Sequence, residues 1–448
     1  MTPRIGIIGG GLMGMALAER LAGPDRAITV FERDTQPGGL AGWQSYGDFY
    51  WDKFYHVVLP TDKELIGFIE GVGLGDSLHW KHTYTGYYVN RKFYSISTSM
   101  EFLLFPPLSM FSKFRLAMTL LLGARITDWK PLEQVTIESW LVKMGGRATF
   151  EKFWKPLLLA KLGENYRRVS AVFIWSYIKR LFEARDASST ARKEQMGYIS
   201  GGYKTLFEHL EATLPDRGCT VRTGTSVERI EAAPDGGVWV TADGERQHFD
   251  KVIFTSPVNV LEQTTDASLV QVTHQGRQVE YLGVICMVLM TRKPFTPYYV
   301  LNLADDRVPF TGVIGMSTLV ETEETGGHYM TYFPKYIISD DPMLREPESV
   351  LQETFLAGVR VMYPELKDED IVSVHINRAI KVQPLQVLGY SEIVPQVRTQ
   401  HPDFYVLNTS QFVHGTLNNN AVIQHVLNFV SAYGAEITQP AAKTPANI

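Results

Sequence analysis

The sequence has few of the features that indicate a disulfide-stabilised, metal-binding or nucleic-acid-binding protein. It contains only two cysteines in 448 residues, Cys219 and Cys286, which are too few and too far apart for a disulfide framework or a zinc site. The formal net charge is -5 at pH 7, so composition gives no electrostatic reason to expect nucleic acid as a partner. We therefore expect no metal and no nucleic acid, and two cysteines that pack as small apolar residues.

Long apolar runs are also scarce, and none reaches the roughly 18 uncharged residues of a membrane-spanning helix. The nearest is the segment 102–126, which Lys113, Arg115 and Arg125 interrupt. We favour a buried or channel-lining helix there. The alternative is a helix whose apolar face contacts a membrane, with its basic residues near the headgroups.

The start of the chain also lacks a targeting signal. An apolar run that predicts a strand begins at residue 4, which leaves no room for a signal peptide. The predicted location is cytoplasmic, with a peripheral position at the inner face of the membrane as the alternative. Hydrophobic residues make up 45% and charged residues 20%, which is typical of a globular protein, and the length suits two or three domains.

Three glycines near the N-terminus, Gly9, Gly11 and Gly14, have the spacing of the dinucleotide-binding fingerprint. They lie between an apolar run, 4–8, that predicts a strand and an alanine- and leucine-rich segment, 15–22, that predicts a helix. Gly9 allows the tight turn, Gly11 lets the backbone approach a pyrophosphate, and Gly14 lets the helix pack on the strand. The phosphates would then accept hydrogen bonds from the free N–H groups at the start of the helix.

A carboxylate and a second glycine cluster follow at positions that narrow the choice of dinucleotide. The apolar run 27–31 ends in Glu32, where an acidic residue accepts hydrogen bonds from the adenosine ribose. Gly38 and Gly39 come shortly after and have no place in a minimal NAD fingerprint. Because glycines permit close backbone approach to a ligand, this cluster predicts a cofactor that continues past the pyrophosphate, which suits FAD better than NAD.

The rest of the chain changes from helical to strand-like patterns. Residues 100–185 predict helices rich in aromatic side chains, and 219–257 predict a β-meander that returns to the first sheet. Long strands are then expected within 282–384, interrupted by a helix at 347–363, and a final helix is expected at 421–433.

Taken in order, these motifs resemble the FAD-dependent amine oxidase superfamily, and most closely protoporphyrinogen oxidases and phytoene-desaturase-like proteins. The resemblance covers nearly the whole chain: the glycine signature, Glu32, Gly38-Gly39, the stretch 155–171, Gly201-Gly202 with the helix after it, and the strands near Val227 and Ile253. It implies non-covalent FAD, because the Ser-Gly-Gly-Cys tether of monoamine oxidases is absent. The cofactor contacts that it implies are Gly9, Gly11, Leu12, Met13, Gly14, Glu32, Arg33, Gly38, Gly39, Leu40, Val227, Ser256, Asn408, Thr409 and Leu417.

The resemblance also implies the fold, which is α/β (α+β overall). A Rossmann-like FAD-binding domain of the glutathione reductase type is expected to interleave with a substrate domain of antiparallel sheet plus helices. The expected FAD-binding domain is discontinuous, 1–84, 196–260 and 396–440. The helical part of the substrate domain is 85–195, its sheet part is 261–395, and 441–448 is a disordered tail.

Two positions depart from the family pattern. Leu40 stands where many members have an arginine after the glycine pair, and Asn408-Thr409 stands where Gly-Asp or Gly-Asn contacts the flavin side chain. Asparagine tolerates left-handed backbone geometry, and Thr409 can donate a hydrogen bond, so we expect this part of the site to survive in altered form.

We predict a FAD-dependent oxidoreductase, an oxidase or dehydrogenase, that passes a hydride to flavin N5 from a bulky, largely apolar small-molecule substrate such as a tetrapyrrole, isoprenoid or amine. Because there is one dinucleotide fingerprint, oxygen or a quinone-like acceptor is expected to reoxidise the flavin. His56 is the candidate catalytic residue, to orient substrate or move a proton; the alternative is a histidine bonded to backbone near the core. Lys155 and Lys161 flank an apolar run, and two interpretations are open. One lysine faces solvent and the other meets an anionic substrate, or, as is more common, both are exposed ends of an apolar helix.

Two other functions remain open. A non-redox nucleotide-sugar isomerase resembling UDP-galactopyranose mutase would use His56 near the flavin and an arginine pair for a diphosphate, for which Arg167-Arg168 is the candidate. A FAD-binding protein without catalysis is suggested by Leu40 and Asn408-Thr409.

Overall fold

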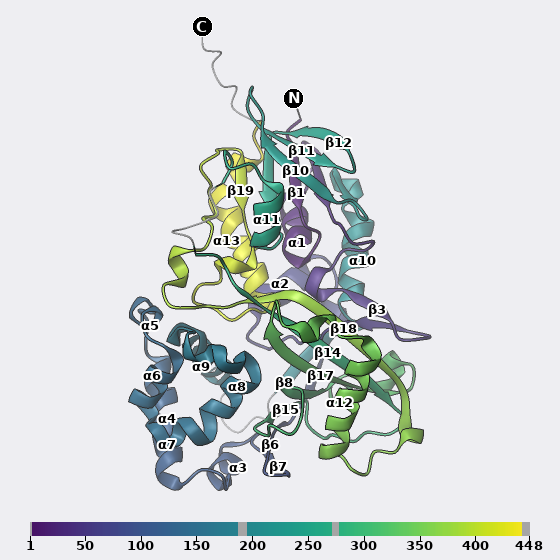
Figure 1. Ribbon diagram of the computed structural model, residues 1–448. Helices are drawn as coiled ribbons and strands as arrows, with labels where there is room; N and C mark the ends of the chain where they lie inside the picture. The colour runs from purple at the N-terminus through teal and green to yellow at the C-terminus, as the bar shows by residue number, and fades with distance from the viewer. Residues whose placement is uncertain (1, 187–194, 271–276, 441–448) are drawn as a thin grey trace.

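The computed structural model describes residues 2–186, 195–270 and 277–440, so the predicted tail 441–448 lies outside them. The described chain forms two parts, one above the other in Figure 1, and the N-terminal strand β1 and the C-terminal helix α13 both lie in the upper part (Figure 1). The lower part contains a long sheet with a group of helices beside it.

A parallel sheet of five strands in the order β19-β13-β1-β2-β9 forms the centre of the upper part. Its strands are β1 (Arg4–Ile8), β2 (Ala27–Phe31), β9 (Cys219–Arg222), β13 (Lys251–Phe254) and β19 (Phe404–Val406). Segments from the start, the middle and the end of the chain therefore share one sheet, and the predicted Rossmann-like fold is confirmed.

Both faces of this sheet are covered, which explains why its strands are apolar runs without alternation. Ile7 and Val30 pack into a cluster with helices on one face, and Ile8 and Phe31 pack against a β-meander on the other. The helices are α1 (Leu12–Leu21), α2 (Lys63–Gly71), α10 (Tyr203–Thr213) and α13 (Asn419–Ile437). The meander is β10 (Val227–Ala232), β11 (Val238–Ala242) and β12 (Glu245–Phe249), accompanied by α11 (Val258–Thr264).

The lower part is built on a seven-stranded sheet in the order β18-β14-β17-β16-β15-β6-β7. Its strands are β6 (Thr85–Val89), β7 (Lys92–Ser95), β14 (Tyr281–Thr291), β15 (Val300–Leu303), β16 (Gly312–Gly315), β17 (Tyr329–Ile338) and β18 (Ile371–Pro384). Every neighbouring pair is antiparallel except β15 and β6. The hairpin β6–β7 thus adds two strands from the range 85–195 to the sheet formed mainly by 261–395.

Helix α12 (Glu348–Met362) packs on one face of this sheet, and segments that lead away from the upper part of the molecule pack on the other. Those segments include the small pairs β3 (Trp43–Ser45) with β4 (Tyr50–Asp52) and β5 (Leu78–His82) with β8 (Gln195–Ile199). Strand β14 is consequently buried at every position.

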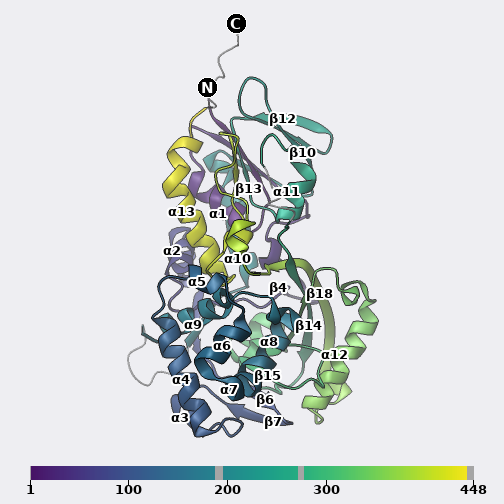
Figure 2. The same cartoon turned by 60° about the vertical axis from the view of Figure 1, so that its left-hand side comes forward.

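A group of helices with its own apolar core lies beside the sheet (Figures 1 and 2). It comprises α3 (Ser99–Leu104), α4 (Met110–Ala124), α5 (Lys130–Glu133), α6 (Ile137–Gly145), α7 (Arg147–Thr149), α8 (Lys155–Leu162) and α9 (Ala171–Asp186). Aromatic residues such as Trp140, Phe150 and Trp175 fill this core, as the composition of the segment predicts.

The interpretation of 102–126 as a buried helix is wrong. The segment is broken at Pro106-Pro107 into α3 and α4, and the large apolar side chains of α4 point outward, with Phe111 68% exposed. Apart from Leu116, the buried positions of α4 carry small and polar residues, and Gly123 fits closely against α6 and α9. Among the described residues, no helix combines the length and apolar character needed to cross a bilayer.

Candidate functional site

The glycine turn between β1 and α1 has the geometry that a phosphate-binding turn requires. Gly9 has a φ of +109°, and a Cβ placed on Gly14 would lie 1.9 Å from the carbonyl oxygen of Gly9. The first intrahelical bond of α1 runs from Met15 N–H to Gly11 O (3.0 Å), and Gly11 caps the helix without a side chain. The N–H groups of Leu12, Met13 and Gly14 precede that bond, so they are free to donate to phosphate oxygens.

The second glycine cluster packs directly on the first. Gly38 N–H donates to Gly10 O (2.9 Å), and Gly38 forms a parallel bridge with Gly11. Gly38 has a φ of +129°, and a Cβ there would lie 2.8 Å from the Cα of Gly42. The contacts of Gly38 with Gly10 and Gly11 join the two predicted glycine clusters into one surface. Leu40 is half-buried in the short 3-10 turn Gly39–Ala41 that follows Gly38.

Glu32 lies at the end of β2, with both carboxylate oxygens engaged by backbone. Its Oε2 accepts from Gly10 N–H and its Oε1 from Asp34 N–H, each at 2.8 Å. Burial raises the pKa of the Glu32 carboxyl. Each oxygen keeps a second lone pair that a ribose hydroxyl can use. The neighbouring Arg33 is exposed, and its Nε lies 3.5 Å from the Asp34 carboxylate.

Val227, the first residue of β10, and Ser256, which follows β13, lie near the carboxyl ends of the parallel strands. Thr225, two residues before Val227, donates its N–H to Glu32 O (2.8 Å), which places the start of β10 beside Glu32. Ser256 follows β13, and a Cβ on Gly9 would lie 2.8 Å from its Oγ. Because the carboxyl ends of parallel strands meet at one edge of the sheet, the predicted contacts gather there.

Asn408 joins two loops of this site through hydrogen bonds of its side chain. It is 1% exposed and extended, with a φ of −146°. Its Oδ1 accepts from Ser410 N–H (3.1 Å) and caps the turn Thr409–Gln411, while its Nδ2 donates to Ser256 O (3.1 Å). The side chain therefore ties the segment after β19 to the segment after β13, and the backbone of Asn408 does not use the left-handed geometry that asparagine tolerates.

Leu417 lies immediately before the N-terminus of α13. Asn418 caps that helix through a bond from Ala421 N–H to its Oδ1 (2.9 Å). Arg180 of α9 donates to Thr416 Oγ1 (3.4 Å) and pairs with Asp62 (3.0 Å), which fixes the loop that carries Leu417. No pattern in the sequence indicated this contact, because Arg180 comes from the helical part.

His56, the predicted catalytic residue, faces Asp52 and Tyr203. The His56 Nδ1 atom lies 3.4 Å from Asp52 Oδ2, and the imidazole packs against the Tyr203 ring with centroids 5.1 Å apart. The other oxygen of Asp52 accepts from Tyr203 N–H (2.9 Å) at the start of α10. Gly202 must be glycine there, because its φ is +74° and a Cβ would lie 2.8 Å from Asp52 Oδ1.

A second polar cluster lies where the cofactor domain, the sheet and the helices meet. The hydroxyls of Tyr55 and Tyr336 are 3.0 Å apart, and Lys161 Nζ lies 4.7 Å from the centre of the Tyr336 ring and 5.2 Å from that of Tyr177. Burial raises the pKa of Tyr55 well above 10.0, so its hydroxyl stays neutral. Lys155, by contrast, pairs with Glu151 (2.8 Å) near the surface. Tyr336 carries no motif, so the sequence could not single it out.

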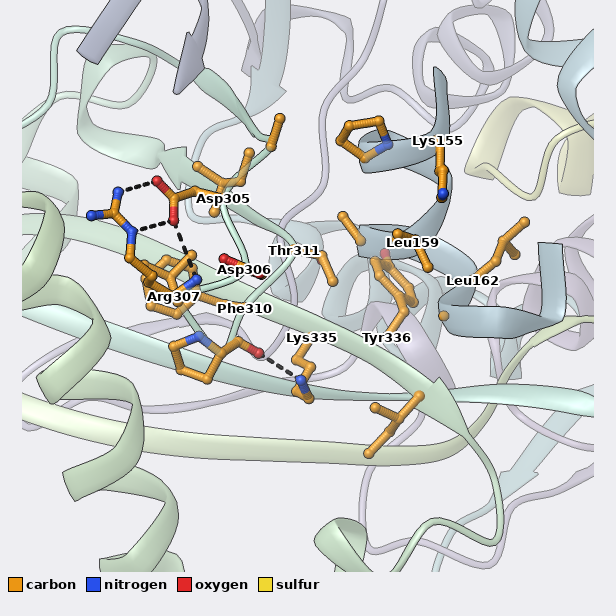
Figure 3. Close-up of a pocket in the computed structure, with 18 of the residues that line it drawn as sticks. Lys155, Leu159, Leu162, Asp305, Asp306, Arg307, Phe310, Thr311, Lys335 and Tyr336 are labelled. Carbon is orange, nitrogen blue, oxygen red and sulfur yellow. Dashed lines mark hydrogen bonds and ion pairs between the residues drawn. The ribbon is translucent and has the colours of Figure 1, made fainter. Parts of the chain in front are cut away.

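Tyr336 also lines a cavity of about 950 Å³ between α8 and the edge of the sheet (Figure 3). Its apolar lining includes Pro156, Leu159 and Phe310. Four cations line it, and three of them have these partners: Arg307 pairs with Asp305, Lys335 Nζ donates to Pro309 O (2.8 Å), and Lys155 pairs with Glu151. The fourth is Arg91. Its volume lies in the range of small-molecule sites.

The parallel sheet and the glycine turn are typical of a dinucleotide-binding protein, and comparisons with known proteins show the family. Residues 12–381 match the family described as flavin containing amine oxidoreductase. The chain is 25% identical over 264 residues to zeta-carotene desaturase of Synechocystis sp., an alignment that spans 53% of each protein. The chain thus covers about half the length of that relative.

Two solved structures share the fold over almost the whole chain. A proposed protoporphyrinogen oxidase from Exiguobacterium sp. 255-15 matches with a TM-score of 0.75 and 19% identity, over 97% of this chain and 99% of that one. Reduced UDP-galactopyranose mutase matches with a TM-score of 0.71 and 16% identity, over 99% of both chains.

The chain belongs to the flavin containing amine oxidoreductase family. The flavin cofactor is FAD, and the predicted family, fold class and cofactor are confirmed. The residues present fit that cofactor, because the free N–H groups of α1, the open space at Gly11 and the spare lone pairs of Glu32 all lie at one edge of the sheet.

Proposed function

We propose that the protein oxidises a bulky, largely apolar substrate that carries an anionic group, such as a tetrapyrrole carboxylate. The observation that carries this proposal is Lys161. Its ammonium lies over the Tyr336 ring, and among the described residues no carboxylate forms an ion pair with it. A cation in a site of low dielectric attracts an anion and repels a protonated amine.

The choice among tetrapyrrole, isoprenoid and amine follows from charge. A protonated amine would meet Lys161 without a compensating carboxylate, which disfavours an amine. A hydrocarbon isoprenoid would leave the ammonium without an anionic partner, with only the Tyr177 and Tyr336 rings beside it. A carboxylated tetrapyrrole would give the ammonium that partner. The cavity in Figure 3 shares Tyr336 with this cluster, and its apolar lining suits the rest of such a substrate.

The chain's own residues would orient the substrate and exclude water. The Tyr55–Tyr336 hydrogen bond fixes both rings at the junction of the three parts, and the neutral Tyr55 hydroxyl serves as a hydrogen-bonding group, not as a base. His56 is proposed to move a proton or orient substrate beside Asp52. When bound, FAD supplies a hydride acceptor at N5. Oxygen or a quinone-like molecule is the proposed final acceptor.

Anaerobic bleaching of the flavin absorbance by candidate substrates tests the proposal. A reduced tetrapyrrole with free carboxylates is expected to bleach the flavin, and its methyl ester is expected to bind at least about tenfold more weakly, the loss of one charge-assisted hydrogen bond. Bleaching by a primary amine but not by the tetrapyrrole would contradict the proposal, as would equal binding of acid and ester.

The nucleotide-sugar isomerase is the second candidate, supported by the shared fold and by His56. Its predicted diphosphate-binding arginines are engaged elsewhere: Arg167 pairs with Glu164 (2.7 Å) and Arg168 with Glu280 (2.5 Å), all on exposed side chains. Turnover of a nucleotide sugar only after prior flavin reduction would establish it. If no substrate bleaches the flavin and no sugar turns over, the chain binds FAD without catalysis.

A further inference from the structure

Helix α4 has its apolar and polar faces reversed relative to an ordinary surface helix. A surface helix normally buries its apolar stripe and exposes its polar one. In α4 the fully buried positions are small or polar except for one leucine: Ser112, Lys113, Leu116, Thr119 and Gly123. Leu120 is partly buried against the core of the helical group. The outward positions carry large apolar side chains, with Met110 62%, Phe111 68% and Phe114 64% exposed.

Helix α3 continues the same exposed surface. Its Met100, Leu103 and Leu104 are 64%, 45% and 70% exposed. Lys113 Nζ donates to Leu103 O (2.6 Å), which joins the two helices, and both lie at the outer lower edge of the molecule (Figure 2). We define the outer face by its large apolar members, Met100, Leu103, Leu104, Met110, Phe111, Phe114, Met118, Leu121 and Leu122. A patch of this kind marks an interaction site.

The charged residues on the outer face are mainly basic. Residues 102–127 contain Lys113, Arg115 and Arg125 and no aspartate or glutamate. The flanking acids are Asp128 and Glu101, and the Glu101 carboxylate accepts from Thr98 N–H at the start of α3. Lys113 is turned inward, the Arg115 guanidinium lies 5.7 Å from the centre of the Phe111 ring, and Arg125 is exposed at the end of α4. This arrangement complements anionic headgroups. Two copies of the chain meeting through this face would instead bring basic residues together with no acidic partner within 102–127.

We propose that the outer face docks on the surface of a lipid bilayer that contains anionic lipids. Helix α4 would lie in the plane of the interface, with Phe111, Phe114 and Leu104 among the acyl chains and Arg125 among the headgroups. The reversed helix then buries both of its faces, one against the protein and one in lipid.

Sedimentation with vesicles tests this proposal on the full-length, flavin-loaded protein. The protein is expected to sediment with vesicles of phosphatidylcholine and phosphatidylglycerol. The variant F111S/F114S/L104S is expected to lose at least about 100-fold in partition coefficient, because three large apolar side chains no longer enter lipid. Arg125→Glu is expected to weaken binding to the anionic vesicles by about fivefold or more, with little change for pure phosphatidylcholine.

The matched control is V350S/V361S/I380S, which removes apolar side chains that are 44%, 46% and 56% exposed elsewhere on the surface. It is expected to bind vesicles as the unaltered protein does. Equal loss in control and test variants would overturn the proposal, and so would failure of the unaltered protein to bind. A dimer in sedimentation equilibrium that F111S/F114S/L104S converts to monomer, without vesicle binding, would assign the face to a second copy.

A fluorescent label gives a readout that does not depend on loss of binding. Cys219 and Cys286 are buried, so an environment-sensitive thiol probe can be directed to Met118→Cys, with Val361→Cys as the control. A blue shift with vesicles at position 118 but not at 361 is expected. No shift at 118 would overturn the proposed orientation.

Discussion

The hydroxyls of Tyr55 and Tyr336 lie 3.0 Å apart although 281 residues separate them in the chain. Tyr55 belongs to the segment that follows the second glycine cluster, and Tyr336 belongs to strand β17 of the seven-stranded sheet. Lys161 of the helical part lies over the Tyr336 ring. The upper part, the seven-stranded sheet and the helical part therefore each contribute one residue to this cluster. The first prediction changes its lysine.

Lys161→Met is expected to weaken the binding of an anionic substrate by about 10- to 100-fold, because a charge-assisted hydrogen bond is lost. Flavin retention should not change. The matched control is Lys155→Met on the same helix, whose ammonium is already paired with Glu151, and it should have little effect. Titration of the flavin spectrum with substrate measures both. Similar losses in the two variants would contradict the role of Lys161.

Gly14→Ala and Gly11→Val are expected to fail for different reasons. A Cβ at position 14 would lie 1.9 Å from a backbone oxygen, so the turn itself must distort, at about 3 kcal/mol or more. A Cβ at position 11 has 4.0 Å of space and an ordinary φ of −68°, so the apoprotein should keep its melting temperature while losing flavin on gel filtration. Retention of flavin by Gly11→Val would contradict the assigned phosphate site.

His56→Ala is expected to slow anaerobic flavin reduction by about 100-fold or more if His56 moves a proton. The exposed His82→Ala serves as control, and flavin content should stay constant in both. Stopped-flow absorbance measures the reduction rate. A rate equal to that of the unaltered protein would assign His56 to a packing role between Asp52 and Tyr203.

Asp52→Ala is expected to destabilise the protein by about 1–3 kcal/mol, because the N–H of Tyr203 at the start of α10 loses its buried acceptor. Asp52→Asn keeps an oxygen at that position and should lose less. Thermal melting followed by flavin fluorescence ranks the two variants. If both variants melt at the same lowered temperature, the negative charge of Asp52 beside His56 stabilises the fold, and the oxygen that accepts from Tyr203 N–H is not sufficient.

Acid is expected to destabilise the protein through His425 of α13. Burial lowers the pKa of His425 from 6.5 to about 4, and its Nε2 lies 2.9 Å from Gln411 Oε1. The folded state binds the proton less readily than the unfolded state does. The contribution of neutral His425 to the free energy of unfolding is therefore complete above about pH 6.5 and is lost as pH falls toward 4. The stability lost is below about 3 kcal/mol, because the ring is partly exposed to solvent.

His425→Gln should flatten the dependence of the melting temperature on pH between these limits. The difference between variant and unaltered protein isolates His425 from other titrating groups. An unchanged slope would show that His425 contributes nothing to the acid sensitivity.

The sequence by itself determined the cofactor and the fold class. The glycines at 9, 11, 14, 38 and 39 and the carboxylate of Glu32 act through local backbone geometry, and their spacing along the chain is the spacing that the turn needs. Apolar runs without alternation likewise specified buried parallel strands. Such features depend on neighbours a few residues away, so they can be recognised before the chain is folded.

Only the tertiary structure decided which residues far apart in the chain contact one another. Asp52 accepts from a helix that starts 151 residues later, and Tyr336 meets Tyr55 and Lys161 through contacts that no local pattern encodes. Apolar spacing in 102–126 indicated a helix with an apolar face, but the direction of that face depends on which surface the neighbouring helices offer. They offer a surface that accepts small residues such as Gly123, and so the phenylalanines of α4 point outward.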